Sequence, residues 1–88
     1  MKRFTVTCSP AIENQLADII LKNWGTPLAE QITAAANRVD TELSMRPLEI
    51  GTQLAANVRI IVVFPLAVEY AVYEDDRTVM LLGYHRAP

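Results

Sequence analysis

Residues 58–86, VRIIVVFPLAVEYAVYEDDRTVMLLGYHR, decide the fold of this chain. They contain three runs rich in β-branched, aliphatic and aromatic residues, a composition typical of strands. Pro65 separates the first two runs, and an acidic turn at residues 74–77 separates the last two. We therefore expect strands over about residues 56–64, 66–73 and 78–85, arranged as an antiparallel meander.

The middle run also predicts which side of the sheet is buried. Successive side chains of a strand point to opposite faces. One set is Leu66, Val68, Tyr70 and Val72, and the other is Ala67, Glu69, Ala71 and Tyr73. The first set is the more apolar, so we expect it in the core and the second set on the opposite face.

The chain before the meander predicts one strand and two helices. Residues 3–8 alternate between apolar and polar side chains, as in a strand with one buried face. Two amphipathic segments follow at about residues 10–23 and 27–46, each opened by a hydroxyl residue and a proline. Gly25 suits a left-handed turn between two antiparallel helices, and Trp24 is expected in the core of this hairpin.

These elements give an α+β fold with the order β-α-α-β-β-β, in which a helical hairpin packs on a mainly antiparallel four-stranded sheet. Residues 47–53 are expected to form a loop, with Gly51 at a positive φ. A chain of 88 residues is long enough for one modest core, so residues 1–88 are predicted to be a single domain.

Charge and hydrophobicity limit the classes of function. Eight Lys and Arg against ten Asp and Glu give a net charge of −2, whereas proteins that hold phosphate backbones usually carry a basic excess. The hydrophobic fraction of 51% is high for so small a domain. It predicts either a continuous apolar surface for a partner or single apolar residues scattered over the surface.

The single cysteine, Cys8, bears on chemistry and compartment. One cysteine forms no intramolecular disulfide and no multi-cysteine metal site, as expected in a reducing cytoplasm. Cys8 is expected to be a small buried residue rather than a reactive thiol. No apolar run of a signal peptide follows Lys2 and Arg3, and the apolar run at residues 60–68 is too short for a membrane helix. We expect a cytoplasmic protein without membrane contact, metal or cofactor.

Three stretches carry a resemblance to a known family: FTVTCSPAIENQLADI at residues 4–19, RPLEIGTQ at residues 46–53, and residues 58–86. On these stretches the chain resembles the RelE/ParE superfamily, the toxins of type II toxin–antitoxin (plasmid stabilisation) systems. The resemblance implies a cognate antitoxin as partner and one of two activities. RelE-like members cut ribosome-bound messenger RNA with basic residues on the exposed sheet face, and ParE-like members block DNA gyrase.

The resemblance also implies site residues, and two cations are among them. Arg59 and Arg86 stand where the family carries basic residues, so both are expected beside the exposed sheet face. Guanidinium groups there would stabilise the charge that builds on a phosphate in the transition state. Ala67 occupies the place of a third family arginine, and Glu69 on the same face would repel phosphate unless it pairs with an arginine.

Tyr84 and His85 are the remaining candidates for acid–base catalysis. A histidine can exchange a proton near neutral pH, but a single one near the end of a chain is often incidental. Tyr84 fits equally an amphipathic residue of the sheet surface, and Arg59 fits a solvated or ion-paired strand residue. The catalytic set considered is thus Arg59, Arg86, His85 and Tyr84.

The leading hypothesis is a RelE/ParE-like toxin with weak or absent RNA cleavage, because Ala67 and Glu69 occupy the expected groove face. One alternative is a ribosome-dependent mRNA endonuclease with a reduced site. The other is a non-catalytic protein-binding module whose apolar surface serves a homodimer or a helical partner.

Overall fold

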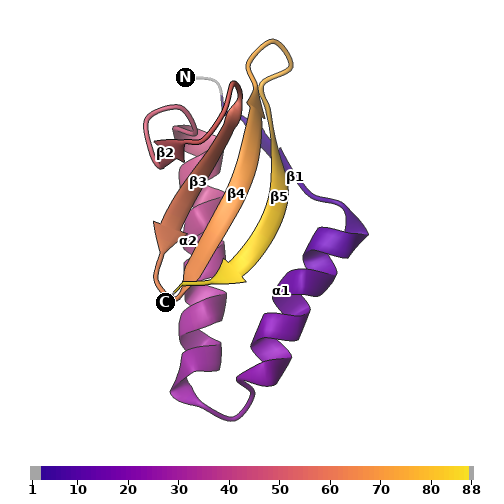
Figure 1. Ribbon diagram of the computed structural model, residues 1–88, viewed down its shortest axis with the longest axis vertical. Coiled ribbons are helices and arrows are strands. Elements are labelled where there is room, and N and C mark those ends of the chain that lie inside the picture. Colours follow the sequence, from indigo (N-terminus) through magenta and orange to yellow (C-terminus); the bar gives the residue numbers. More distant parts are fainter. Residues whose placement is uncertain (1–2, 88) are drawn as a thin grey trace.

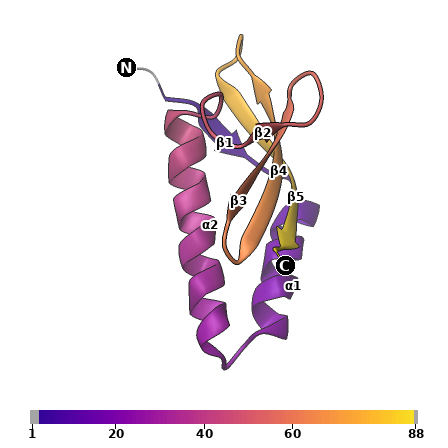
Figure 2. The same cartoon turned by 60° about the vertical axis from the view of Figure 1, so that its left-hand side comes forward.

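The computed structural model describes residues 3–87, so Lys2, considered above as the start of a signal peptide, lies outside the described residues. The elements are β1 (Thr5–Thr7), α1 (Pro10–Lys22), α2 (Pro27–Met45), β2 (Thr52–Gln53), β3 (Val58–Val63), β4 (Leu66–Tyr73) and β5 (Thr78–Arg86). Both helices lie on one side of a twisted sheet (Figures 1 and 2). The predicted α+β fold is confirmed.

The sheet has five strands in the order β1-β5-β4-β3-β2, one more than the sequence predicted. β1 pairs with β5 in parallel, and all other neighbours are antiparallel. β3 and β4 are joined by a tight turn whose Phe64-Pro65 peptide bond is cis. The meander therefore forms the centre of the sheet, and the two short strands β1 and β2 lie at its edges.

The prediction of a plain loop at residues 47–53 is wrong in one respect, because β2 lies within it. β2 is only two residues long, and it pairs with Ile60 and Arg59 of β3. A dipeptide has no periodicity that could distinguish it from a loop. Its strand conformation depends on this tertiary pairing. Gly51, just before β2, has the predicted positive φ, at 73°.

The helix starts differ from each other although their sequences are alike. The Ser9 hydroxyl accepts a hydrogen bond from the Ile12 amide at 3.4 Å, as expected for an N-cap. Thr26 makes no such bond at the start of α2, and its hydroxyl instead donates to the Asn23 carbonyl at 2.6 Å. Thr26 thus closes the turn between the helices, where Gly25 has a φ of 81°.

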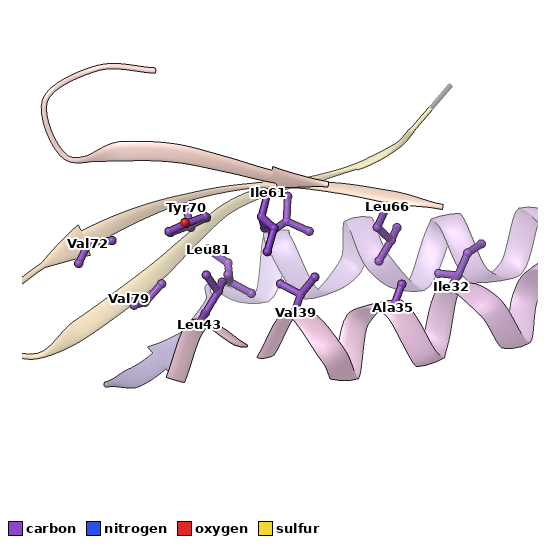
Figure 3. Close-up of a cluster of buried hydrophobic side chains, with 11 residues drawn as sticks. Ile32, Ala35, Val39, Leu43, Ile61, Leu66, Tyr70, Val72, Val79 and Leu81 are labelled. Carbon is purple, nitrogen blue, oxygen red and sulfur yellow. The ribbon is translucent and has the colours of Figure 1, made fainter. Parts of the chain in front are cut away.

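The core lies between α2 and the central strands. Figure 3 shows side chains of β3, β4 and β5 pointing towards those of α2. As predicted, Leu66, Val68, Tyr70 and Val72 of β4 are buried, but Ala71, which was assigned to the opposite face, is only 2% exposed as well. α2 contributes Ile32, Ala35, Val39 and Leu43 to the same cluster. The opposite side of the sheet carries no helix, and we call it the open face.

Trp24 is not in the core of the helical hairpin, contrary to the prediction. It lies just beyond Asn23, the C-cap of α1, and 74% of its surface is exposed. Ile19 and Ile20 are the last residues of α1 that pack against the core cluster, and Trp24 lies beyond them. A large aromatic residue is therefore displayed at the junction of the two helices.

Tyr70 fastens the loop before β2 to the sheet. Its hydroxyl is buried and donates to the Pro47 carbonyl at 2.9 Å, with the Ile50 carbonyl as a second acceptor at 3.0 Å. Burial raises the pKa of Tyr70 above its ordinary value, so the hydroxyl keeps the proton that it donates. The adjacent Arg59 donates its Nε to the same Ile50 carbonyl at 3.2 Å.

Replacing Tyr70 by Phe should lower the free energy of unfolding by about 1–3 kcal/mol, because the buried hydrogen bond to the Pro47 carbonyl is lost and the Ile50 carbonyl loses one of its donors. Urea denaturation of purified protein would measure this. Tyr73→Phe is the matched control at the exposed end of β4 and should change the free energy by less than about 0.5 kcal/mol. Equal losses in the two variants would contradict the proposed fastening.

Candidate functional site

The open face is formed by alternate residues of the three central strands. Directly paired residues of neighbouring strands point to the same side of a sheet, so the register assigns each side chain to a face. Partners of the buried Val68 and Tyr70 face the helices, and partners of Ala67 and Glu69 do not. The open face comprises Val58, Ile60 and Val62 of β3, Ala67, Glu69, Ala71 and Tyr73 of β4, and Thr78, Met80, Leu82, Gly83 and His85 of β5.

One polar pair lies on this face. His85 Nε2 and Glu69 Oε1 are 2.7 Å apart, and both side chains are partly exposed. Gly83 lies beside them, and a Cβ on this residue would stand 3.1 Å from His85 Nε2. The missing side chain of Gly83 leaves the imidazole room to reach Glu69 across the strands. Glu69 thus pairs with His85, and not with an arginine.

Several apolar side chains on or beside the open face are exposed to solvent. Val62 is 62% exposed, Met80 42% and Leu82 39%. Phe64, in the turn after β3, is 64% exposed. Ala67, Ala71 and Gly83 have a methyl side chain or none, so the surface projects little at these positions. A largely apolar surface around the His85–Glu69 pair is suited to contact with another apolar surface.

No Lys or Arg of residues 3–87 belongs to the open face. Lys22, Arg38 and Arg46 are in or next to the helices, Arg3 precedes β1, and Arg77 lies in the β4–β5 turn with its guanidinium 4.7 Å from the Phe4 ring centroid. The two arginines of the central strands, discussed next, point to the helix side. The open face therefore lacks the cations that a phosphate-binding surface needs.

Arg59 was expected beside the open face, and this placement is wrong. Arg59 pairs with the buried Tyr70 and so points to the helix side. Its guanidinium donates to the carbonyl oxygens of Ile50 at 3.2 Å and Gly51 at 3.4 Å. Arg59 is thereby committed to holding the loop before β2.

Arg86 and Tyr84 also point to the helix side, for a different reason. A β-bulge in β5 places both Leu82 and Gly83 opposite Glu69, so the alternation of faces shifts by one residue beyond this point. Arg86 is paired with the buried Leu66. Without the bulge, Tyr84 and Arg86 would share the open face with Met80 and Leu82, and His85 would not.

The shifted residues are held by α1 and by Asn23, the C-cap of this helix. Arg86 Nη1 donates to Asn23 Oδ1 at 3.1 Å, and the Tyr84 amide donates to Gln15 Oε1 at 3.0 Å. Burial raises the pKa of Tyr84, which makes its hydroxyl a poorer proton donor near neutral pH.

The four candidate residues therefore do not form one site. Only His85 reaches the open face. Arg59 and Arg86 pair with β4 residues four positions apart, a separation of about 13 Å along the strand. Sequence reasoning missed Gly83 and Gln15. A glycine inside a strand pattern is a recognised sign of a bulge, whereas nothing in the sequence indicates the contact of Gln15.

Neither a cluster of metal ligands nor a membrane-spanning helix is found in the described part of the chain. Residues 3–87 contain no group of three or more His, Cys, Asp or Glu side chains placed to hold a metal ion. Within the same residues, neither helix combines the length and the apolar character that crossing a membrane requires.

Comparison with solved structures shows the fold. A chain of the toxin–antitoxin complex RelBE2 from Mycobacterium tuberculosis superposes with a TM-score of 0.76 at 19% sequence identity, covering 98% of this chain and 93% of that one. The chain therefore has the RelE/ParE-type fold that the sequence resemblance implied. No family model matches the sequence, and neither does any curated protein.

Cys8 should be a slow nucleophile. Partial burial raises the pKa of its thiol, and the Glu13 carboxylate, with Oε1 3.7 Å from Sγ, raises it further. Less thiolate is then present at pH 7–8 than for a free cysteine, so alkylation by iodoacetamide should be slower. Glu13→Gln should lower the pKa and speed the reaction. A pH series of rates that is identical in both proteins would contradict the role of Glu13.

Proposed function

We propose that this chain is the toxin component of a type II toxin–antitoxin system and that it acts by binding a protein target, not by cutting RNA. In this proposal residues 1–88 work as one domain in the cytoplasm. The observation that carries it is the RelE/ParE-type fold combined with an open face without Lys or Arg among residues 3–87. The target class is the one that ParE-like toxins block, DNA gyrase.

The chemistry of RNA cleavage explains why the missing cations matter. Attack of a ribose hydroxyl on a phosphate builds negative charge, which fixed cationic groups must stabilise. Arg59 and Arg86, the two candidates for this role, donate hydrogen bonds on the helix side of the sheet. On the open face, the Glu69 carboxylate would instead repel a phosphate.

The same face suits a protein partner. Its exposed side chains include Val62, Met80 and Leu82, which would gain free energy by leaving water. The similar RelBE2 chain comes from a toxin–antitoxin complex, which supports a cognate antitoxin as one partner here. An antitoxin that covers the open face would exclude the target by competition.

A ribosome-dependent mRNA endonuclease is the second candidate, and the His85–Glu69 pair is the observation that favours it. The carboxylate 2.7 Å from Nε2 can orient the imidazole and leave its other nitrogen to exchange a proton with a substrate. Such an enzyme would have to take its cationic groups from the ribosome, because the open face of residues 3–87 offers none.

Induced expression without an antitoxin should arrest growth, and Leu82→Asp should relieve the arrest. A carboxylate buried without a partner costs about 3–5 kcal/mol, so target binding should weaken roughly a hundredfold or more. Colony counts after induction would measure this. Leu48→Asp, in the loop after α2 and similarly exposed at 43%, should remain toxic. A wild-type chain that never slows growth would refute the toxin assignment.

Purified protein should leave ribosome-bound messenger RNA intact, which primer extension on the recovered message would detect. Cleavage by the wild-type chain that disappears in His85→Ala would replace the proposed mechanism by the second candidate. Circular dichroism of the variant would show that the loss is not one of folding.

A further inference from the structure

The surface where the two helices meet is incompletely packed. None of the α1 residues is buried, whereas α2 buries five. Ile19 and Ile20 reach the core only in part, and Leu21 is 66% exposed. Figures 1 and 2 show the two helices joined at the end of the molecule far from the β4–β5 turn and splaying apart from there. The helical layer therefore has apolar side chains that are only partly covered, on a surface separate from the open face.

A groove of about 370 Å³ lies between the helices at this junction. Ile20 and Trp24 form one wall, and Ala29 and Ala34 contribute apolar surface from α2. Thr33, Asn37 and Glu30 supply its polar groups. A second hollow of about 530 Å³ shares Trp24, Ala29 and Glu30 with it and continues it over the turn between the helices. We call the two together the hairpin groove.

The walls of the groove favour a helix as its occupant. Helix backbones have already satisfied their own amides and carbonyls, so the groove offers no strand edge to which an extended peptide could add. Ala29 and Thr33 are one turn apart on α2 and small, which allows a third helix to approach at a packing distance of about 8–10 Å.

The charge of the groove selects a basic partner. Among the residues that line it, all within the described part of the chain, Glu30 alone is charged. The exposed ring of Trp24 borders the same hollows, and tryptophan is the side chain that best attracts a cation to its face. A carboxylate beside an open indole suits a lysine or arginine side chain and disfavours a phosphate.

We propose that the hairpin groove binds an amphipathic helix of a partner protein, with aliphatic side chains against Ile20, Trp24 and Ala34 and a lysine or arginine against Glu30. This binding surface is separate from the open face and does not depend on what the open face binds. An experiment that refutes helix binding in the hairpin groove therefore leaves the toxin proposal untouched, and the reverse also holds.

A display library of helical peptides with a randomised face, selected against the purified chain, tests the proposal. Enriched peptides should combine aliphatic residues with a lysine or arginine at helical spacing. Trp24 is the only tryptophan of the chain, so its fluorescence reports the groove directly. Binding of the synthesised peptides should shift this emission to shorter wavelength.

Glu30→Lys should weaken the selected peptides by about tenfold and should favour versions in which their cation is replaced by glutamate. Ala34→Glu should block them by filling the groove. Glu49→Lys, an equal charge reversal in the loop after α2, should leave the affinity unchanged, as should Leu82→Asp on the open face. Circular dichroism would confirm that every variant is folded. A selection without helical basic peptides, or peptides insensitive to Glu30→Lys, would overturn the proposal.

Discussion

The structure depends on the burial of alternate side chains of β4 beneath α2. Leu66, Val68 and Tyr70 are completely buried, and each faces the helical layer from the central strand of the sheet. Because side chains of a strand alternate, this burial fixes the opposite set of β4, including Glu69, on the open face. β3 and β5 pair with β4 on either side, so the faces of their residues follow from the same constraint.

The bulge in β5 interrupts this alternation of faces. It decides which side chains at the end of β5 lie on the open face and which lie on the helix side. It turns His85 to the open face, where it meets Glu69 over the space left by Gly83. It also turns Arg86 to the helix side, where it bonds Asn23. A single extra residue thereby exchanges the Arg86 guanidinium for the His85 imidazole on the open face.

The sequence was sufficient where one physical effect dominated. Alternation in β4 predicted the buried set that faces the helices, although Ala71 of the opposite set is only 2% exposed as well. Gly51 indicated its positive φ, because sterics leave few other choices there. It was insufficient where a tertiary contact decided between local conformations that the sequence permits equally well. The pairing of β2 with β3, the hydrogen bonds of Arg59 to the loop, and the bulge beyond Leu82 are of this kind. The family pattern placed two arginines correctly in the chain, but not on the correct side of the sheet.

Neither of these arginines contributes its charge to the open face, because both point to the helix side. The guanidinium of Arg59 satisfies loop carbonyls and that of Arg86 satisfies a side-chain amide, so each is used where an unmet backbone or polar group would otherwise cost free energy. Within the open face, Glu69 Oε1 lies 2.7 Å from His85 Nε2. The described residues thus offer two different surfaces: a largely apolar sheet face without Lys or Arg, and a groove between the helices that is lined by the Glu30 carboxylate. Two surfaces of such different chemistry are better suited to two different partners than to one.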